Sequence, residues 1–124
     1  PMVVSYDTSP VAEVVYADPP VTDAPTASLL GPGTCFRQIE FVGILKGTGN
    51  PDLAKKFVDF MLGQKFQEDI PMQMFMYPVN SNAHLPEEYS LYAGQASQPA
   101  SLDPAVIAAN RERWITDWTE VVLH

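Results

Sequence analysis

The residues best suited to binding chemistry lie together near the start of the chain. An aromatic ring, a carboxylate and two hydroxyls come from the consecutive residues Tyr6, Asp7, Thr8, Ser9 and Pro10. An aromatic ring can stack on a planar ligand, and a carboxylate can neutralise a positive charge. Turns that lead from a strand into a helix are frequent ligand sites, because side chains and free backbone N–H groups converge there. A simple capped turn explains the same residues, so both interpretations stay open at this point.

The sequence offers little for catalysis. Cys35 is the single cysteine, so the chain can build neither an internal disulfide nor a thiolate metal site. His84 lies in a polar stretch, and nothing in the sequence places it beside Cys35. The glycines at 31–33 and 47–49 lack the lysine and the spacing of a phosphate loop, and they predict turns. We therefore predict that the protein is not an enzyme, with no cofactor and no metal site; a small Cys/His hydrolase that uses Cys35 and His84 is the alternative.

Methionines and aromatic residues gather at positions 72–79. Their side chains can form a soft apolar surface for a ligand or fill a core, and the residue types alone favour the core. The residues concerned are Met72, Met74, Phe75 and Met76. Farther along, Trp114 and Trp118 share one helical stripe and are predicted to anchor that helix against another part of the molecule.

Acidic residues outnumber basic ones by 15 to 7, which gives a formal net charge of -8. This balance argues against nucleic acid or an anionic membrane as a partner, because a basic patch supplies most of the affinity for them. It suits an exported soluble protein or the recognition of a cationic ligand. No run approaches the roughly 20 apolar residues that span a bilayer. The chain begins with Pro1 inside an apolar run and without an initiator methionine, so we expect a segment of a longer protein or a processed product.

Two stretches predict strands. Residues 3–6 are apolar and extended in type, and residues 36–45 are rich in β-forming side chains and end at a glycine-containing turn. Strands that alternate with helices favour an α/β layered architecture. Because two strands do not make a complete sheet, we expect residues 1–124 to supply part of one.

Pairs of a capping residue and a proline mark three helix starts. Residues 18–34 contain several prolines and separate the first helix from the second strand. A fourth, short helix over 64–69 is expected to stop before Pro71. The three capped helices are expected from Ser9-Pro10 to Ala17, from Asn50-Pro51 to Leu62 before Gly63, and from Asp103-Pro104 to Val122.

Several stretches resemble, in order, the thiamine-binding proteins of ABC importers. The more specific ones are residues 4–10 and 76–79, whereas the helix predicted at 50–62 is common to many solute-binding proteins. Other similar positions are Phe66, Gln67, Ile70, Pro71, Ala108, Ala109, Arg111, Trp114, Ile115 and Trp118.

The resemblance implies a two-lobed periplasmic-binding-protein fold of type II, whose lobes are three-layer α/β/α sandwiches. This chain would be its incomplete C-terminal portion, from a strand that returns through the hinge to the final helix at 103–122. Its implied function is to capture thiamine or a thiamine-like small cationic solute. Where the family has a second aromatic residue, two positions after Pro10, this chain has Ala12. The implied ligand-binding residues are Tyr6, Asp7, Thr8, Ser9, Pro10 and Phe75.

The same resemblance implies the partners and the location. The partners are a thiamine-like solute, an ABC permease in the inner membrane and the N-terminal portion of the same protein. Separately, an exposed face where sheet strands are absent would favour a homodimer. The location is periplasmic or extracellular and membrane-associated, after export by a signal segment outside this chain. Other solutes stay open: a polyamine, a ferric complex or a pyrimidine. So does an interaction module that has no pocket near Tyr6 and Phe75.

Overall fold

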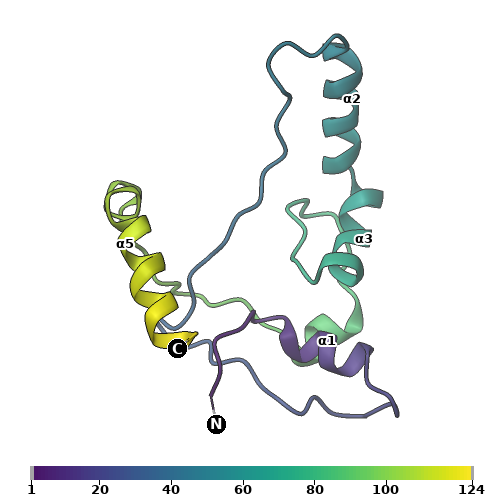
Figure 1. Ribbon diagram of the computed structural model, residues 1–124. Coiled ribbons are helices and arrows are strands. Elements are labelled where there is room, and N and C mark those ends of the chain that lie inside the picture. Colours follow the sequence, from purple (N-terminus) through teal and green to yellow (C-terminus); the bar gives the residue numbers. More distant parts are fainter. Residues whose placement is uncertain (1, 124) are drawn as a thin grey trace.

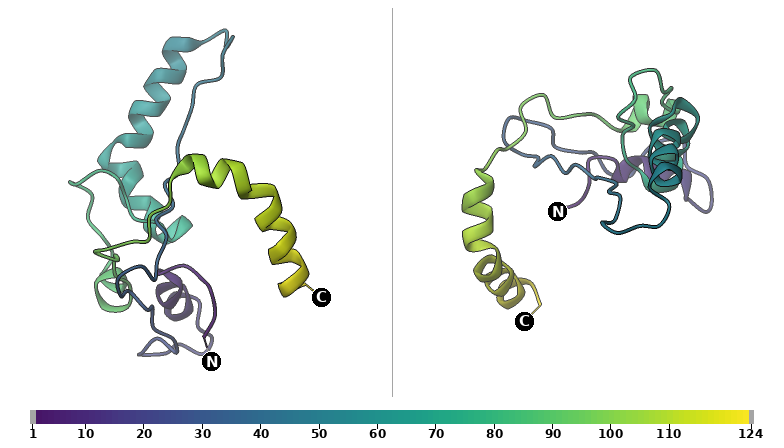
Figure 2. Two further views of the ribbon diagram at one scale, coloured as in Figure 1. Left: turned by 90° about the vertical axis from the view of Figure 1, so that its left-hand side faces the viewer. Right: turned by 90° about the horizontal axis from the view of Figure 1, so that it is seen from above.

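The computed structural model describes residues 2–123, whose regular structure is helical (Figure 1). Pro1, where the chain begins, lies outside this range. α2 and α3 follow each other in one column, α1 packs on α4 near its base, and α5 stands apart after a long extended segment (Figures 1 and 2). The helices within residues 2–123 are α1 (Ser9–Val15), α2 (Pro51–Leu62), α3 (Gln64–Met74), α4 (Glu87–Tyr92) and α5 (Pro104–Val122).

The predicted starts of α2 and α5 are confirmed, whereas α1 begins one residue earlier than predicted, at Ser9, with Thr8 in the N-cap position. Each of these helices has proline in its first two positions, where the missing N–H costs no helical hydrogen bond. The Asp103 carboxylate caps α5 by accepting a hydrogen bond of 2.8 Å from the Ala105 backbone N–H. Asn50 makes no such side-chain cap on α2. α1 ends at Val15, two residues before the predicted Ala17.

The prediction that the helix after Gly63 stops before Pro71 was wrong. α3 continues through Pro71 to Met74. Pro71 is buried, and its carbonyl accepts hydrogen bonds from the Phe75 backbone N–H (3.0 Å) and from the Tyr89 hydroxyl (2.8 Å). These contacts offset the helical hydrogen bond that the proline nitrogen cannot donate. The short helix α4 was not predicted, although Glu87 and Glu88 in its first turn suit the positive end of its dipole.

The predicted strands at 3–6 and 36–45 are extended but do not form a sheet. A strand needs a neighbouring strand for its backbone hydrogen bonds, and residues 2–123 provide only the isolated parallel bridge between Phe36 and Ala100. The α/β sandwich is therefore not formed by these residues, whose regular elements are helices. The two predicted glycine turns do form, with Gly33 and Gly47 at φ 73° and 87°.

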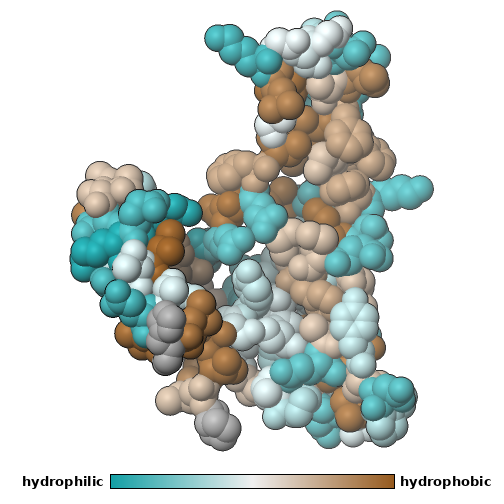
Figure 3. Space-filling view, viewed as in Figure 1, coloured by the Kyte–Doolittle hydropathy of each residue, from teal (hydrophilic) through white to brown (hydrophobic). Residues whose placement is uncertain are grey.

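The buried core is small and lies around α1, α3 and α4. Val11, Pro10, Pro71, Tyr89 and Ala96 are its buried apolar residues, and Thr8 and Gln67 are the buried polar ones. By contrast, neither α2 nor α5 has a buried residue. Hydrophobic surface is accordingly visible along the α2 column (Figure 3).

The predicted apolar anchors lie largely on the surface. Trp118 is 58% exposed and Met74 is 60% exposed, whereas Trp114 is half-buried. The prediction of core packing was therefore wrong for Met74. Rings do pack at the junction of α2 and α3, where Phe60 and Phe66 meet edge to face at 5.5 Å.

Candidate functional site

The segment from Tyr6 to Pro10 meets the end of α3 at Phe75. The Thr8 hydroxyl donates a hydrogen bond of 2.7 Å to the Phe75 backbone carbonyl. Thr8 is only 3% exposed, so this bond is shielded from competing water. Two parts of the predicted site, far apart in the sequence, are thus joined directly.

The backbone of Phe75 is unusual. It ends α3 in the left-handed conformation, with φ 52° and ψ 37°, where glycine is the common residue. A side chain in this conformation costs roughly 1–2 kcal/mol. Such strain persists where the surroundings hold it, and it gathers at functional sites. Here the Thr8 hydroxyl holds the Phe75 carbonyl, and the Pro71 carbonyl holds its N–H.

The Phe75 ring packs against Tyr16. Their centroids are 5.5 Å apart and their planes are inclined at 63°, an edge-to-face arrangement. Tyr16 follows the last residue of α1, and its backbone N–H donates to the Ala12 carbonyl at 3.0 Å. Sequence reasoning missed Tyr16; the available signal was its spacing of one helical turn from Ala12.

A carboxyl and two phenols lie close to this contact. Burial raises the pKa of Asp7, although hydrogen bonds from the Asp7 and Thr8 backbone partly oppose it. Burial, and then the Asp7 charge, raise the pKa of Tyr77 to about 12, and burial with the Tyr77 and Asp7 charges does the same for Tyr89. The two phenol rings meet edge to face at 5.3 Å. The Asp7 carboxylate is therefore a partly desolvated negative charge, which favours a cation beside it.

The buried hydroxyl of Tyr77 has no hydrogen-bond partner among the described residues. Tyr89, by contrast, donates its hydroxyl to the Pro71 carbonyl at 2.8 Å. An unpaired buried hydroxyl is uncommon because it costs the desolvation of a polar group. This cluster therefore retains one unused hydrogen-bonding group.

The remaining predicted residues differ in their surroundings. Tyr6 is 69% exposed, whereas Pro10 is fully buried at the start of α1. The Ser9 hydroxyl shares a hydrogen bond of 2.7 Å with the Ser5 hydroxyl. The structure therefore joins Thr8 to Phe75, leaves the Tyr6 ring open and places Pro10 in the core.

Gln67 fixes the segment that follows Phe75. Its side-chain amide donates to the Met61 carbonyl at 2.8 Å and accepts from the Val79 backbone N–H at 2.7 Å. Asn80 adds a hydrogen bond of 2.9 Å to the Leu62 carbonyl. The end of α2, the start of α3 and the 77–80 segment are thereby tied together, which sets where Phe75 lies.

The alternative catalytic pair is not assembled. The Cys35 thiol donates to the Leu29 carbonyl at 3.5 Å, while the His84 backbone N–H donates to a carboxylate oxygen of Glu68 at 3.1 Å. Among the hydrogen bonds of residues 2–123, none joins the Cys35 and His84 side chains. No group of three His, Cys, Asp or Glu side chains suited to a metal ion occurs in the same residues.

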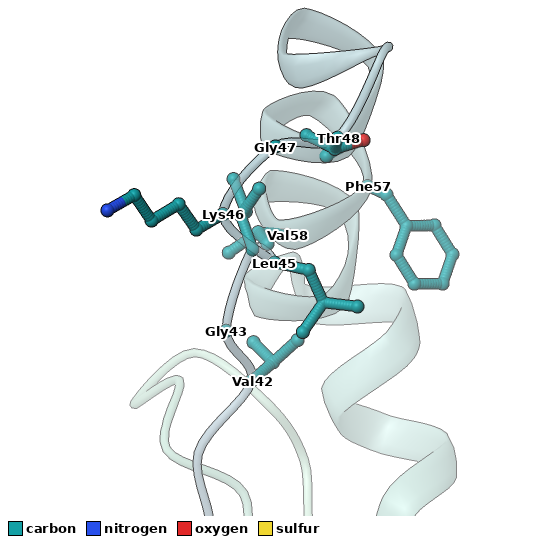
Figure 4. A pocket seen from close by; sticks show the side chains of 10 residues that line it. Val42, Gly43, Leu45, Lys46, Gly47, Thr48, Phe57 and Val58 are labelled. Carbon is teal, nitrogen blue, oxygen red and sulfur yellow. The ribbon is translucent and has the colours of Figure 1, made fainter.

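A hollow away from these residues lies between the 42–48 segment and α2 (Figure 4). It is lined by apolar side chains such as Val42, Leu45 and Val58, and Lys46 points away from it. With no converging polar group, it lacks the features that orient a small ligand. In the part of the chain that the structure describes, no helix has the length and apolar character to cross a membrane.

No family model matches the chain. It is similar to the thiamine-binding periplasmic protein of Escherichia coli (strain K12), with 32% identity over 124 residues, 98% of this chain and 35% of that protein. The protein of the same name from Brucella suis biovar 1 is 35% identical over 120 residues, which cover 95% of this chain and 34% of that protein. A solved structure of a periplasmic thiamin binding protein matches with a TM-score of 0.51 and 34% identity, over 62% of this chain and 24% of the other. The chain spans about a third of the length of these relatives.

Proposed function

We infer that this chain, a relative of the thiamine-binding periplasmic proteins over nearly all of its length, is a C-terminal portion of a solute-binding protein of an ABC importer. Its function is to capture thiamine, or a thiamine-like small cationic solute, and to deliver it to a membrane permease. The single observation that carries this proposal is the Thr8–Phe75 hydrogen bond. It holds an aromatic residue in a strained backbone conformation beside a partly desolvated carboxylate.

The chemistry of thiamine suits this arrangement. Thiamine carries a permanent positive charge on its thiazolium ring and has a second, neutral aminopyrimidine ring. An aromatic side chain attracts a flat cation through its π face, and a desolvated carboxylate neutralises the charge. The proposed ligand-binding residues are Tyr6, Asp7, Thr8, Ser9, Pro10 and Phe75.

The proposed fold is part of a two-lobed type II sandwich, completed by an N-terminal portion of the same protein. Three features support this partner: the unpaired extended segment at 36–45, the lack of any buried residue on α2 and α5, and the length of the relatives. Large exposed apolar patches mark surfaces that another segment covers. A homodimer through the same surface is the competing possibility, and a doubled mass in native mass spectrometry would favour it.

The location follows from the same relationship. We propose export to the periplasm, or to the outer face of the membrane, by a signal segment outside this chain, and docking on a permease in the inner membrane. A binding role needs no bond-making residue, cofactor or metal. The separate hydrogen bonds of Cys35 and His84 support this non-enzymatic role over the hydrolase alternative.

Ligand titration tests the proposal. Purified protein is titrated with thiamine by calorimetry and by native mass spectrometry, both as this chain and joined to its N-terminal portion. Spermidine, cytosine and a ferric chelate serve as the competing solutes. We expect one thiamine per protein and weaker binding of the other three. If a competing solute binds more tightly than thiamine, the thiamine assignment is wrong while the solute-binding role stands.

The pH dependence gives a second test, through Asp7. Because burial raises the pKa of Asp7, its charge is lost at a higher pH than for an ordinary carboxyl, and we expect affinity for a cation to fall as the pH drops through that raised value. Asp7→Asn should weaken thiamine binding about fivefold at neutral pH, the equivalent of about 1 kcal/mol for a partly exposed ion pair. Calorimetry at several pH values measures both effects, and Asp7→Asn corrects for the titration of the ligand itself.

The same substitution should have the opposite effect on folding. A carboxyl whose pKa is raised in the folded state favours folding more as the pH falls, because the folded form then binds the proton more readily. Asp7→Asn should therefore be more stable than the wild type at neutral pH, with the difference shrinking in acid. If Asp7→Asn is less stable than the wild type at neutral pH and binds thiamine normally, Asp7 is not a ligand-binding residue.

A further inference from the structure

We propose that Tyr16 is a specificity-determining residue of this site, and that it forms with Phe75 a two-ring corner that holds both rings of a bent, cationic ligand. This inference rests on the proposed function, because it names the part of the site that selects a two-ring solute. The observation that carries it is the edge-to-face contact of the two rings, with centroids 5.5 Å apart and planes inclined at 63°.

Tyr16 is held in place but remains open. Its backbone N–H is bonded to the Ala12 carbonyl at 3.0 Å, so its position at the end of α1 is fixed. The residue is nevertheless 70% exposed, although its ring contacts Phe75. Much of the Tyr16 ring is therefore available to a ligand that lies in the corner.

The small residue at position 12 leaves room for this ring. Residues four apart lie on the same side of a helix, and helical side chains lean toward the N-terminus. By this rule we expect the Tyr16 side chain, one residue past the end of α1, to lean over the turn that contains Ala12. A ring at position 12 would compete for the same space, so Ala12 and Tyr16 act as a pair of small and large side chains over one surface.

The shape of the corner suits thiamine. The aminopyrimidine and thiazolium rings are joined through a single carbon, so the ligand bends at that carbon and its two rings lie in different planes. Two inclined protein rings offer a separate surface to each of them. A solute with a single ring needs only one surface, and the corner therefore discriminates by the number of rings.

The test uses the complete protein and two probes: thiamine, and the thiazolium half of thiamine alone. Tyr16→Ala should weaken thiamine binding about tenfold and fragment binding much less, so that the ratio of the two affinities falls about tenfold. Tyr16→Phe should retain the wild-type ratio. Tyr16→Leu preserves apolar bulk against Phe75 but removes the aromatic ring. The ratio of thiamine affinity to fragment affinity should therefore still fall, which separates ligand recognition from packing. Trp118→Ala, remote on α5, is the matched control.

The most demanding test moves the aromatic ring from position 16 to position 12, one helical turn earlier. The double substitution Ala12→Tyr with Tyr16→Ala should recover at least part of the thiamine preference, because it presents a ring over the same turn. Thiamine affinity that is unchanged in both Tyr16→Ala and Tyr16→Leu would overturn the role of Tyr16 while leaving the binding function intact. Failure of the wild-type protein to bind thiamine would overturn both.

Discussion

Replacement of Phe75 by alanine should weaken thiamine binding by about 5- to 150-fold. The stacking of a planar ring on an aromatic side chain contributes about 1–3 kcal/mol, which corresponds to that range of affinities. Phe75 is the residue in which the proposed ligand contact, the strained backbone and the hydrogen bond from Thr8 coincide. Calorimetric titration of the variant and the wild type measures the change.

Two further variants at this position separate binding from folding. Phe75→Gly removes the ring and also relieves the left-handed backbone, so it should be about 1 kcal/mol more stable than Phe75→Ala while binding thiamine equally poorly. Phe75→Leu keeps apolar bulk without a π face and should bind weakly as well. Phe57→Ala, which removes an exposed ring from α2, should bind normally. Normal binding by both Phe75→Ala and Phe75→Leu would exclude Phe75 from the site.

Replacement of Gln67 by leucine should lower the free energy of unfolding by about 1–3 kcal/mol. Gln67 is 5% exposed, and leucine leaves both the Met61 carbonyl and the Val79 N–H without their partner. Both hydrogen bonds are only partly buried, so water can replace part of each, and the loss of one such bond costs about 0.5–1.5 kcal/mol. Urea unfolding followed by circular dichroism measures the loss.

A matched control lies on the same helix. Gln73 is exposed near the end of α3, and Gln73→Leu should change the free energy of unfolding by less than about 0.5 kcal/mol. Gln67→Glu preserves the acceptor for the Val79 N–H but not the donor to the Met61 carbonyl. Its loss of unfolding free energy should therefore lie between those of Gln67→Leu and Gln73→Leu. Equal stability of Gln67→Leu and Gln73→Leu would show that Gln67 does not tie the 77–80 segment to α2.

Local signals in the sequence predicted the helix starts well. A capping residue followed by proline acts within a few residues; α2 and α5 start directly after it, and α1 starts one residue earlier than it predicts. The end of α3 was mistaken because the rule for Pro71 is also local, whereas the Tyr89 hydroxyl that bonds to the Pro71 carbonyl comes from 18 residues farther along the chain. The strand prediction at 36–45 had the extended backbone right, but pairing depends on strands elsewhere.

In the candidate site, too, the residues in local sequence patterns were predicted and those that depend on distant contacts were not. Resemblance to a family drew attention to Tyr6 through Pro10 and to Phe75, and the structure joins Thr8 to Phe75. It could not reveal Tyr16, because the contact with Phe75 depends on how α1 and α3 meet in space. Gln67 was noticed only as a similar position, since its two backbone partners lie before and after α3.

The Thr8–Phe75 hydrogen bond has a consequence for how the molecule assembles. It joins residues 67 positions apart, so it is a long-range contact that closes a large loop, and contacts of this kind slow folding. The entropy of such a closure grows slowly with length, by about 0.6 kcal/mol for each doubling. The irregular stretch at 18–34 lies inside this loop and has contacts of its own: the Ser28 hydroxyl donates to the Asp7 carbonyl and the Tyr92 hydroxyl donates to the Thr22 carbonyl, each at 2.8 Å. A change in the length of the chain between Thr8 and Phe75 therefore costs little loop-closure entropy, as long as these contacts are kept.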